Sequence, residues 1–246
     1  MRMIASAFLA VFALGHSPAI LAQDALVAVA ANFTAAAEDL AEAFAAETGQ
    51  EIGLSFGATG QFYAQITQGA PFHAFLSADA ATPARLLDEG LGVEGSSFTY
   101  AIGKLVLFST DPDLVSGPES LEGDFTQIAI AEPQAAPYGA AAVETIAALG
   151  LTERLADRMV VGQNISQTFQ FVDTGNAELG FVALSQVIGR EDGSSWIVAD
   201  DLYTPITQDA VLLDAENATA SAFLDFLHSD AARTIIEAYG YGFAPQ

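Results

Sequence analysis

The sequence has 246 residues, enough for one large domain or for two lobes of ordinary size. It carries 31 acidic and 7 basic residues, a formal net charge of −24, which excludes the basic surfaces that nucleic acids and anionic lipids require. Because it contains no cysteine, it can form neither a disulfide nor a lipid anchor on an N-terminal cysteine.

The first 22 residues have the pattern of a secretory signal peptide. Arg2 supplies the positive charge, an apolar run follows over residues 4–14, and Ala22 is a small residue at the position expected of a cleavage site. This run is too short to span a bilayer, and no later stretch approaches about 18 apolar residues, so we expect no membrane insertion. The pattern predicts cleavage near Ala22 and a soluble periplasmic protein.

Four segments then repeat one arrangement of an apolar strand, a short loop and a helix. The strands are expected over residues 25–29, 52–56, 128–130 and 159–161. The helices that follow them are expected over 35–46, 61–68, 140–149 and 167–173. Strand–loop–helix alternation predicts an α/β fold with mostly parallel sheets flanked by helices.

Two similar halves indicate two α/β lobes with a ligand cleft between them. The strand-like segment 97–108 could carry the chain from the first lobe to the second, and residues 204–213 could carry it back. We therefore expect residues 23–103 and 206–246 to form lobe one and residues 104–205 to form lobe two. The amphipathic helix over residues 218–227 would complete lobe one.

The four loops carry small, hydroxyl or amide residues at the predicted helix starts. Taken singly, such residues indicate N-caps, because their side chains satisfy the free N–H groups of a first helical turn. Taken together, helix starts that face one cleft would present backbone N–H groups and positive dipole ends to an anion. The residues are Asn32 with Thr34, Thr59 with Gly60, Tyr138 with Gly139, and Asn164 with Ser166.

None of these four loops contains Lys, Arg or His, so a bound anion would be held by neutral donors alone. Hydrogen bonds to a charged group contribute about 1.5–3 kcal/mol each. Several of them reach the roughly 8 kcal/mol that micromolar binding needs. A site made only of donors favours a fully deprotonated dianion, because a protonated anion also needs an acceptor for its O–H group.

Other chemistries have weaker support in the sequence. Residues 53–57 match the G-x-S-x-G pattern of serine hydrolases, with His228 further along, but Ser55 falls inside a strand and not at a strand-to-helix elbow. Only His73 and His228 follow the signal, which argues against a histidine-rich metal site. Iron held by Tyr239, Tyr241 and acids is a further alternative. There is no P-loop for ATP hydrolysis.

At these same loops the chain resembles the periplasmic molybdate-binding proteins of ABC transporters. The matching segments are VAANFT at 29–34, SFGATG at 55–60, GAP at 69–71, FLSAD at 75–79, PYG at 137–139, NAELGFVA at 176–183 and YGYGF at 239–243. The likeness spans nearly the whole chain after the signal. It implies a type II periplasmic-binding-protein fold with a tetrahedral oxyanion between the lobes.

The resemblance also implies which residues contact the oxyanion. By position these are Asn32, Thr59, Tyr138 and Ile165, the last through its backbone N–H, and we include the neighbours Ala31 and Ala58 in the expected site. Many members of the family have Ser in place of Asn32, a small residue in place of Tyr138 and Tyr in place of Ala183. The chain thus looks like a second branch, in which Asn and Tyr take over donor roles.

We therefore expect a monomeric receptor, not an enzyme, that needs no cofactor and binds molybdate or tungstate. It would deliver the ion to an ABC permease in the inner membrane, with no nucleic acid as partner. A receptor for sulfate or another oxyanion is one alternative, and a serine hydrolase using Ser55 is an alternative of a different class.

Overall fold

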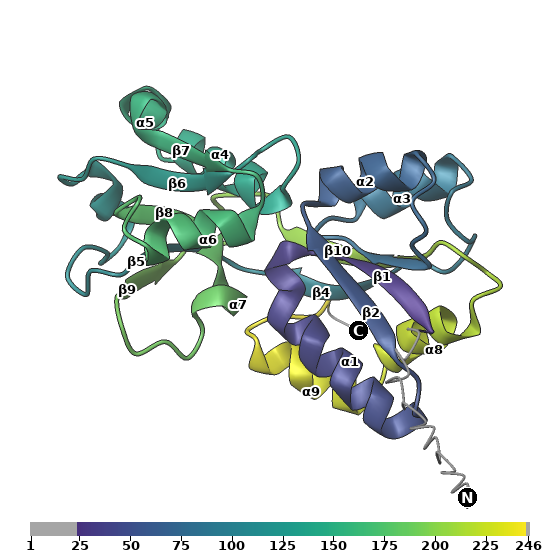
Figure 1. The fold of residues 1–246 in the computed structure, drawn as a ribbon. Helices are drawn as coiled ribbons and strands as arrows, with labels where there is room; N and C mark the ends of the chain where they lie inside the picture. Colours follow the sequence, from purple (N-terminus) through teal and green to yellow (C-terminus); the bar gives the residue numbers. More distant parts are fainter. Residues whose placement is uncertain (1–23, 245–246) are drawn as a thin grey trace, which may run out of the picture.

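The computed structural model describes residues 24–244 as two α/β lobes that lie side by side (Figure 1). The first lobe contains the strands β1 (Ala25–Ala30), β2 (Ile52–Gly57), β3 (Ala74–Leu76), β4 (Phe98–Gly103) and β10 (Ile206–Leu212). Its helices are η1 (Ala31–Phe33), α1 (Thr34–Thr48), α2 (Thr59–Thr67), α3 (Ala81–Asp88), α8 (Ala218–Phe226) and α9 (Asp230–Ala238). The predicted signal peptide lies outside the described residues.

The second lobe is built from the middle of the chain. Its strands are β5 (Leu105–Ser109), β6 (Ile128–Ala131), β7 (Met159–Gly162), β8 (Leu179–Ala183) and β9 (Ser194–Ile197). Its helices are η2 (Pro118–Glu122), α4 (Pro137–Ala148), α5 (Thr152–Leu155), η3 (Ala156–Arg158), α6 (Ile165–Asp173) and α7 (Leu184–Val187). Lys104 alone separates β4 of one sheet from β5 of the other.

The two sheets have the same design. The strand orders are β2-β1-β3-β10-β4 and β7-β6-β8-β5-β9. In each, three neighbouring strands are parallel, the fourth is antiparallel to them, and the fifth is antiparallel to the fourth. Four of the five strands in each sheet therefore point the same way. The predicted two-lobed α/β fold with mostly parallel, helix-flanked sheets is confirmed.

Each sheet buries both faces, as the apolar strand sequences require. Along β1, Val27 and Val29 pack with α1, α8 and α9, whereas Ala28 between them packs with α2 and α3. Along β5, Leu105 and Leu107 belong to the core under α4 and α5, and Val106 packs with α6 and α7. Side chains alternate across a strand, so one short apolar run supplies two cores.

Three of the four predicted helices begin two or three residues earlier than the sequence pattern indicates. Helix α2 begins at Thr59, α4 at Pro137 and α6 at Ile165. Proline suits the first helical position, because its missing N–H has no intrahelical partner there and its φ is already helical. As a result Thr59, Tyr138 and Ile165 lie in first turns, and the residue before each helix provides the extended N-cap.

Candidate functional site

Four loops meet where the two lobes face each other. They follow β1, β2, β6 and β7, two strands from each sheet, and each leads directly into a helix. The carboxyl ends of parallel strands lie at the same edge of a sheet, so both pairs of loops reach the junction between the lobes. The topology thus brings together chain segments that are more than 100 residues apart.

These loops line a small cavity between the lobes. All six residues of the expected site line it, namely Asn32, Thr59, Tyr138, Ile165, Ala31 and Ala58. The remaining lining residues, which the sequence reasoning did not list as contacts, are Ala30, Gly57, Ala78, Ala136, Pro137 and Asn164. Within the described part of the chain no ionisable acid or base other than the tyrosine lines this cavity.

The helix starts supply backbone donors to the cavity. N–H groups in the first turn of a helix have no intrahelical partner and carry the positive end of the helix dipole. Thr59, Tyr138 and Ile165 occupy such positions at α2, α4 and α6. Three dipole ends from two lobes therefore converge on one small space.

Side-chain capping occurs at only one of the four loops. Asn164 Oδ1 accepts a hydrogen bond from the backbone N–H of Gln167 at 3.0 Å, as predicted for an N-cap. The same prediction is wrong for Asn32, which lies inside η1 while Ala30 and Phe33 occupy the cap positions. It is also wrong for Thr59, which is the first residue of α2 and not its cap.

The Thr59 hydroxyl is oriented by a bond across lobe one. Its oxygen accepts the backbone N–H of Ala78 at 3.1 Å, and the side chain is 2% exposed. Among residues 24–244 no acceptor takes its hydroxyl hydrogen. Since Thr59 lines the cavity, this hydrogen is available to an anion there.

Asn32 is tied to residues far away in the sequence. Its Nδ2 donates to Gln208 Oε1 at 2.7 Å and to the Tyr241 hydroxyl at 3.0 Å. The Tyr241 hydroxyl in turn donates to the backbone oxygen of Asn32 at 2.7 Å. Sequence reasoning missed Gln208. The signal was a Gln at a core-facing position of the alternating strand β10, between Ile206 and Ala210.

The Tyr138 side chain reaches from lobe two into lobe one. Its hydroxyl is buried beside Gly103, where any side-chain carbon would overlap it. Burial raises the pKa of the Tyr138 hydroxyl well above 10, and burial likewise raises that of Tyr241. Both groups therefore stay neutral and can donate a hydrogen bond at any physiological pH.

The lobes are in direct contact around the cavity. The backbone N–H of Gly60 donates to Ala135 O at 2.9 Å, and a side-chain carbon at Gly60 would stand 3.0 Å from Ala135 Cα. On the other side, Ser185 Oγ donates to Asn32 O at 2.8 Å. These bonds join lobe two to lobe one on two sides of the cavity, so the lobes are in contact around it.

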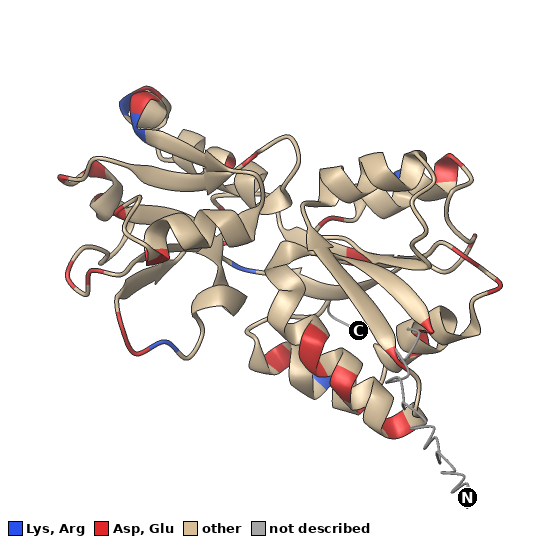
Figure 2. Ribbon diagram, in the orientation of Figure 1, with Lys and Arg blue, Asp and Glu red and all other residues tan. Residues whose placement is uncertain are grey.

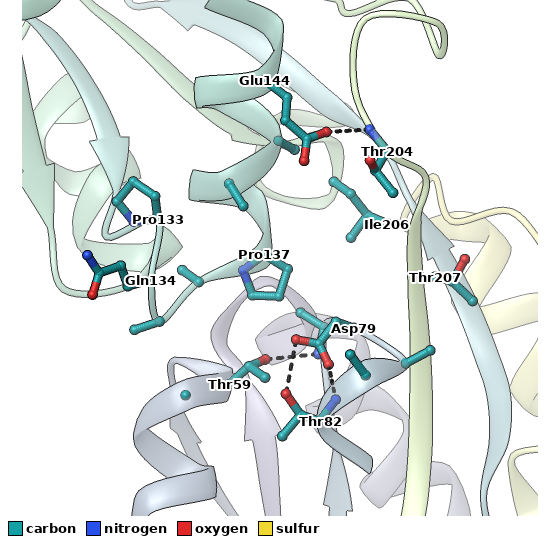
Figure 3. A pocket seen from close by; sticks show the side chains of 18 of the residues that line it. Thr59, Asp79, Thr82, Pro133, Gln134, Pro137, Glu144, Thr204, Ile206 and Thr207 are labelled. Atoms are coloured by element: carbon teal, nitrogen blue, oxygen red, sulfur yellow. Dashed lines mark hydrogen bonds between the residues drawn. The ribbon is translucent and has the colours of Figure 1, made fainter. Parts of the chain in front are cut away.

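A larger cleft of about 440 Å³ lies beside the cavity and shares Thr59, Ala78, Ala136 and Pro137 with it (Figure 3). Its ionisable lining residues are the acids Asp79 and Glu144. Asp79 accepts from the backbone N–H of Thr82 at 2.7 Å, and Glu144 accepts from that of Thr204 at 2.6 Å. Two carboxylates repel an anion, so the small neutral cavity is the better anion site despite its size.

The other candidate chemistries do not come together. Ser55 lies inside β2 and α2 begins only at Thr59, so the strand-to-helix elbow of a serine hydrolase is missing at this serine. Tyr239 donates to Asp39 at 2.7 Å, whereas Tyr241 bonds Asn32, so the two tyrosines do not share a site. Within residues 24–244 no group of three His, Cys, Asp or Glu residues is placed to hold a metal ion.

Comparison with known proteins decides the family. The family model described as "Bacterial extracellular solute-binding protein" matches residues 25–242, nearly the whole described chain. This chain belongs to that family. It is 54% identical over 223 residues to the molybdate-binding protein ModA of Rhodobacter capsulatus, covering 89% of this chain and 88% of the relative.

Two further matches come from Azotobacter vinelandii. Its molybdate-binding protein ModA is 52% identical over 228 residues, with 90% of each chain covered. Its periplasmic molybdate-binding protein of known structure superposes with a TM-score of 0.88 at 41% identity, covering 90% of this chain and all of the other. The resemblance inferred from the loops is confirmed, and the family's two-lobed binding-protein fold is the one observed.

Proposed function

We propose that this protein is a periplasmic receptor that binds molybdate or tungstate and delivers it to an ABC permease. The observation that carries the proposal is the uncharged cavity at the lobe junction, to which three helix starts bring N–H groups. The relatives at 52–54% identity are named as molybdate-binding proteins, which supports the choice of ion.

The donors of the cavity can supply the required affinity without a cation. First-turn N–H groups of Thr59, Tyr138 and Ile165 and the Thr59 hydroxyl give four donors for one dianion. At about 1.5–3 kcal/mol for each hydrogen bond to a charged group, four of them contribute about 6–12 kcal/mol. Micromolar to nanomolar binding corresponds to about 8–12 kcal/mol.

Neutral donors also suit a protein with this overall charge. Acidic residues are spread over the outer helices and loops of both lobes, α1 among them (Figure 2). A dianion approaching the surface is therefore repelled, and the ion is held only where N–H and O–H groups surround it. Because all those groups donate, an anion that carries its own proton leaves that proton without an acceptor.

Delivery requires the lobes to separate and come together again, since hydrogen bonds join them around the cavity. We propose that the lobes divide at 103/104 and at 205/206, which the change from β4 to β5 and the return at β10 support. We also propose that the protein acts as a monomer, without a cofactor or catalytic step, after removal of residues 1–22. None of the helices in residues 24–244 has the length and apolar character to cross a membrane.

A ligand panel tests the proposal. Thermal unfolding is measured in separate samples of one protein preparation, each with a single added ligand. The ligands are molybdate, tungstate, sulfate, phosphate and Fe(III). A ligand that binds only the folded state at about 100 times its Kd adds about 2.7 kcal/mol to the free energy of unfolding. For a chain of this size that raises Tm by about 5–11 °C.

We expect molybdate and tungstate to give this shift, and phosphate and Fe(III) to give none. A shift with sulfate and none with molybdate would replace the proposed ligand by another oxyanion. A shift with Fe(III) alone would refute an oxyanion receptor altogether.

A further inference from the structure

Gln208 is a buried polar side chain that the proposed function does not explain. It lies on β10, is fully buried, and does not line the cavity. Its Oε1 accepts the Asn32 Nδ2–H at 2.7 Å and lies 3.4 Å from the Tyr100 hydroxyl. An apolar residue would fill this core position without the cost of burying an amide.

Two buried polar atoms near Gln208 have no partner among the described residues. They are its own Nε2 and the hydroxyl of Tyr138. Both lie beside Gly103, where a side-chain carbon would overlap the hydroxyl and stand 3.0 Å from Nε2. Folded proteins leave few buried groups of this kind unpaired. Two of them beside the same glycine at the lobe junction point to a second pattern of hydrogen bonds at this place.

The present orientation of the Asn32 amide does not suit an anion. Its two N–H hydrogens are taken by Gln208 Oε1 and by the Tyr241 hydroxyl at 3.0 Å. The remaining polar atom of this side chain is Oδ1, an acceptor. Asn32 lines the cavity, so in this orientation it offers an anion an oxygen and not a hydrogen.

Rotating both terminal amides by 180° exchanges nitrogen and oxygen and leaves the other atoms in place, since these torsions are roughly two-fold. Gln208 Nε2 then lies 2.7 Å from Asn32 Oδ1 and 3.4 Å from the Tyr100 oxygen, and it can donate one hydrogen to each. Tyr100 already donates its own hydrogen to Ser77 O at 2.9 Å, so its oxygen is free to accept.

The same rotation changes the partners of the neighbouring groups. Gln208 Oε1 takes the place of Nε2 beside Gly103. Tyr241 can donate to Asn32 Oδ1, because the backbone oxygen of Asn32 keeps the hydrogen bond from Ser185 Oγ at 2.8 Å. The Tyr241 hydrogen then has an acceptor in Asn32 Oδ1, and the Asn32 Nδ2–H hydrogens become available to the cavity.

We propose that Gln208 is a positioning residue: in the anion-bound protein it donates to Asn32 Oδ1 and thereby aims the Asn32 N–H at the anion. The proposal rests on the proposed function, because it needs a dianion in the cavity. Under this proposal Gln208 does not touch the ligand. It decides whether Asn32 presents a hydrogen-bond donor or an acceptor to the cavity. Gln208 thus acts on the charge preference of the site through Asn32.

A double-mutant cycle with molybdate as probe tests this coupling. Calorimetric titration compares the wild type with Gln208→Met, Asn32→Ala and the double variant; Met keeps the length of the side chain and removes its amide. We expect Gln208→Met to weaken binding about 10-fold or more in the wild type and less than about twofold when Asn32 is already Ala. An equal loss in both backgrounds, or no loss in the wild type, would overturn the proposal.

The orientation itself is measurable in the wild type, which removes any dependence on the folding of a variant. In the molybdate complex, the Gln208 side-chain N–H₂ hydrogens are expected to give nuclear Overhauser effects to the ring of Tyr100 and none to that of Tyr138. Contacts to Tyr138 alone would contradict the rotated orientation. If the wild type binds no molybdate, the proposed function fails; if it binds and the cycle is additive, only the role of Gln208 fails.

Discussion

Replacing Thr59 by Val tests one hydroxyl for its role in both binding and stability. Valine keeps the shape of the side chain and removes an oxygen that accepts the Ala78 N–H at 3.1 Å and has its hydrogen free for the cavity. Two effects follow. The anion loses one charge-assisted hydrogen bond, and the protein keeps a buried backbone N–H without an acceptor, since Ala78 is 3% exposed.

The magnitudes follow from these two losses. A hydrogen bond to a charged group is worth about 1.5–3 kcal/mol, which at 1.4 kcal/mol for each factor of ten predicts binding weaker by about 10- to 150-fold. An unsatisfied buried N–H costs about 1–3 kcal/mol in the free energy of unfolding. At about 2–4 °C for each kcal/mol, Tm of the free protein should fall by about 2–12 °C.

Thr145→Val provides the matched control. Thr145 is also a fully buried threonine, but its hydroxyl donates to Ala141 O at 2.8 Å within α4 and does not line the cavity. This variant should lose about 1 kcal/mol of stability and keep its affinity. Calorimetric titration with molybdate and thermal unfolding of both variants supply the comparison. If Thr59→Val binds molybdate within twofold of the wild type, the hydroxyl does not contact the anion and the site has been placed wrongly.

Three more predictions follow from the site. Gly60→Ala should bind molybdate several-fold more weakly because its new carbon crowds Ala135 across the lobe junction, while the free protein becomes no less stable because Ala favours a helix. Unchanged affinity in titration, or a lower Tm of the free protein, would contradict this. Ser55→Ala should leave affinity within about threefold, and any esterase activity that disappears in it would favour an enzyme. Affinity should be level between pH 6 and 9, because burial raises the pKa of Tyr138 and of Tyr241 and both stay protonated donors over that range; a steep loss of affinity by pH 9 would reveal a titrating donor.

The local pattern of the sequence was sufficient for the fold class. Short apolar runs followed by loops and helical periodicity predicted the two-lobed α/β architecture, and the strands and helices lie close to the expected ranges. These features depend on neighbours a few residues apart, through backbone geometry and the spacing of apolar side chains. The loops around Asn32, Thr59, Tyr138 and Ile165 were located in the same way, because each follows a parallel strand.

Capping was the point at which local reasoning failed. Asn and Thr at a helix start predict a side-chain cap, and among the four site loops the prediction holds for Asn164 alone. At Asn32 a stronger competitor exists, since its amide bonds Gln208 and Tyr241, which are 176 and 209 residues away. A helix-capping propensity describes how a side chain bonds its own neighbouring backbone when no distant partner is within reach. At Asn32 such partners are within reach, so the propensity does not decide its hydrogen bonds.

The sequence by itself determined the elements, the sign of the surface charge and the lack of basic residues in the four loops. Only the tertiary structure decided that Gln208, Tyr100 and Tyr241 lie under the cavity and that Tyr138 crosses from one lobe to the other beside Gly103. The physical reason is that hydrogen-bond direction is set by whichever groups the packed chain brings within about 3 Å. Those partners come from both ends of the chain and from both sheets, and no local pattern fixes which of them meet.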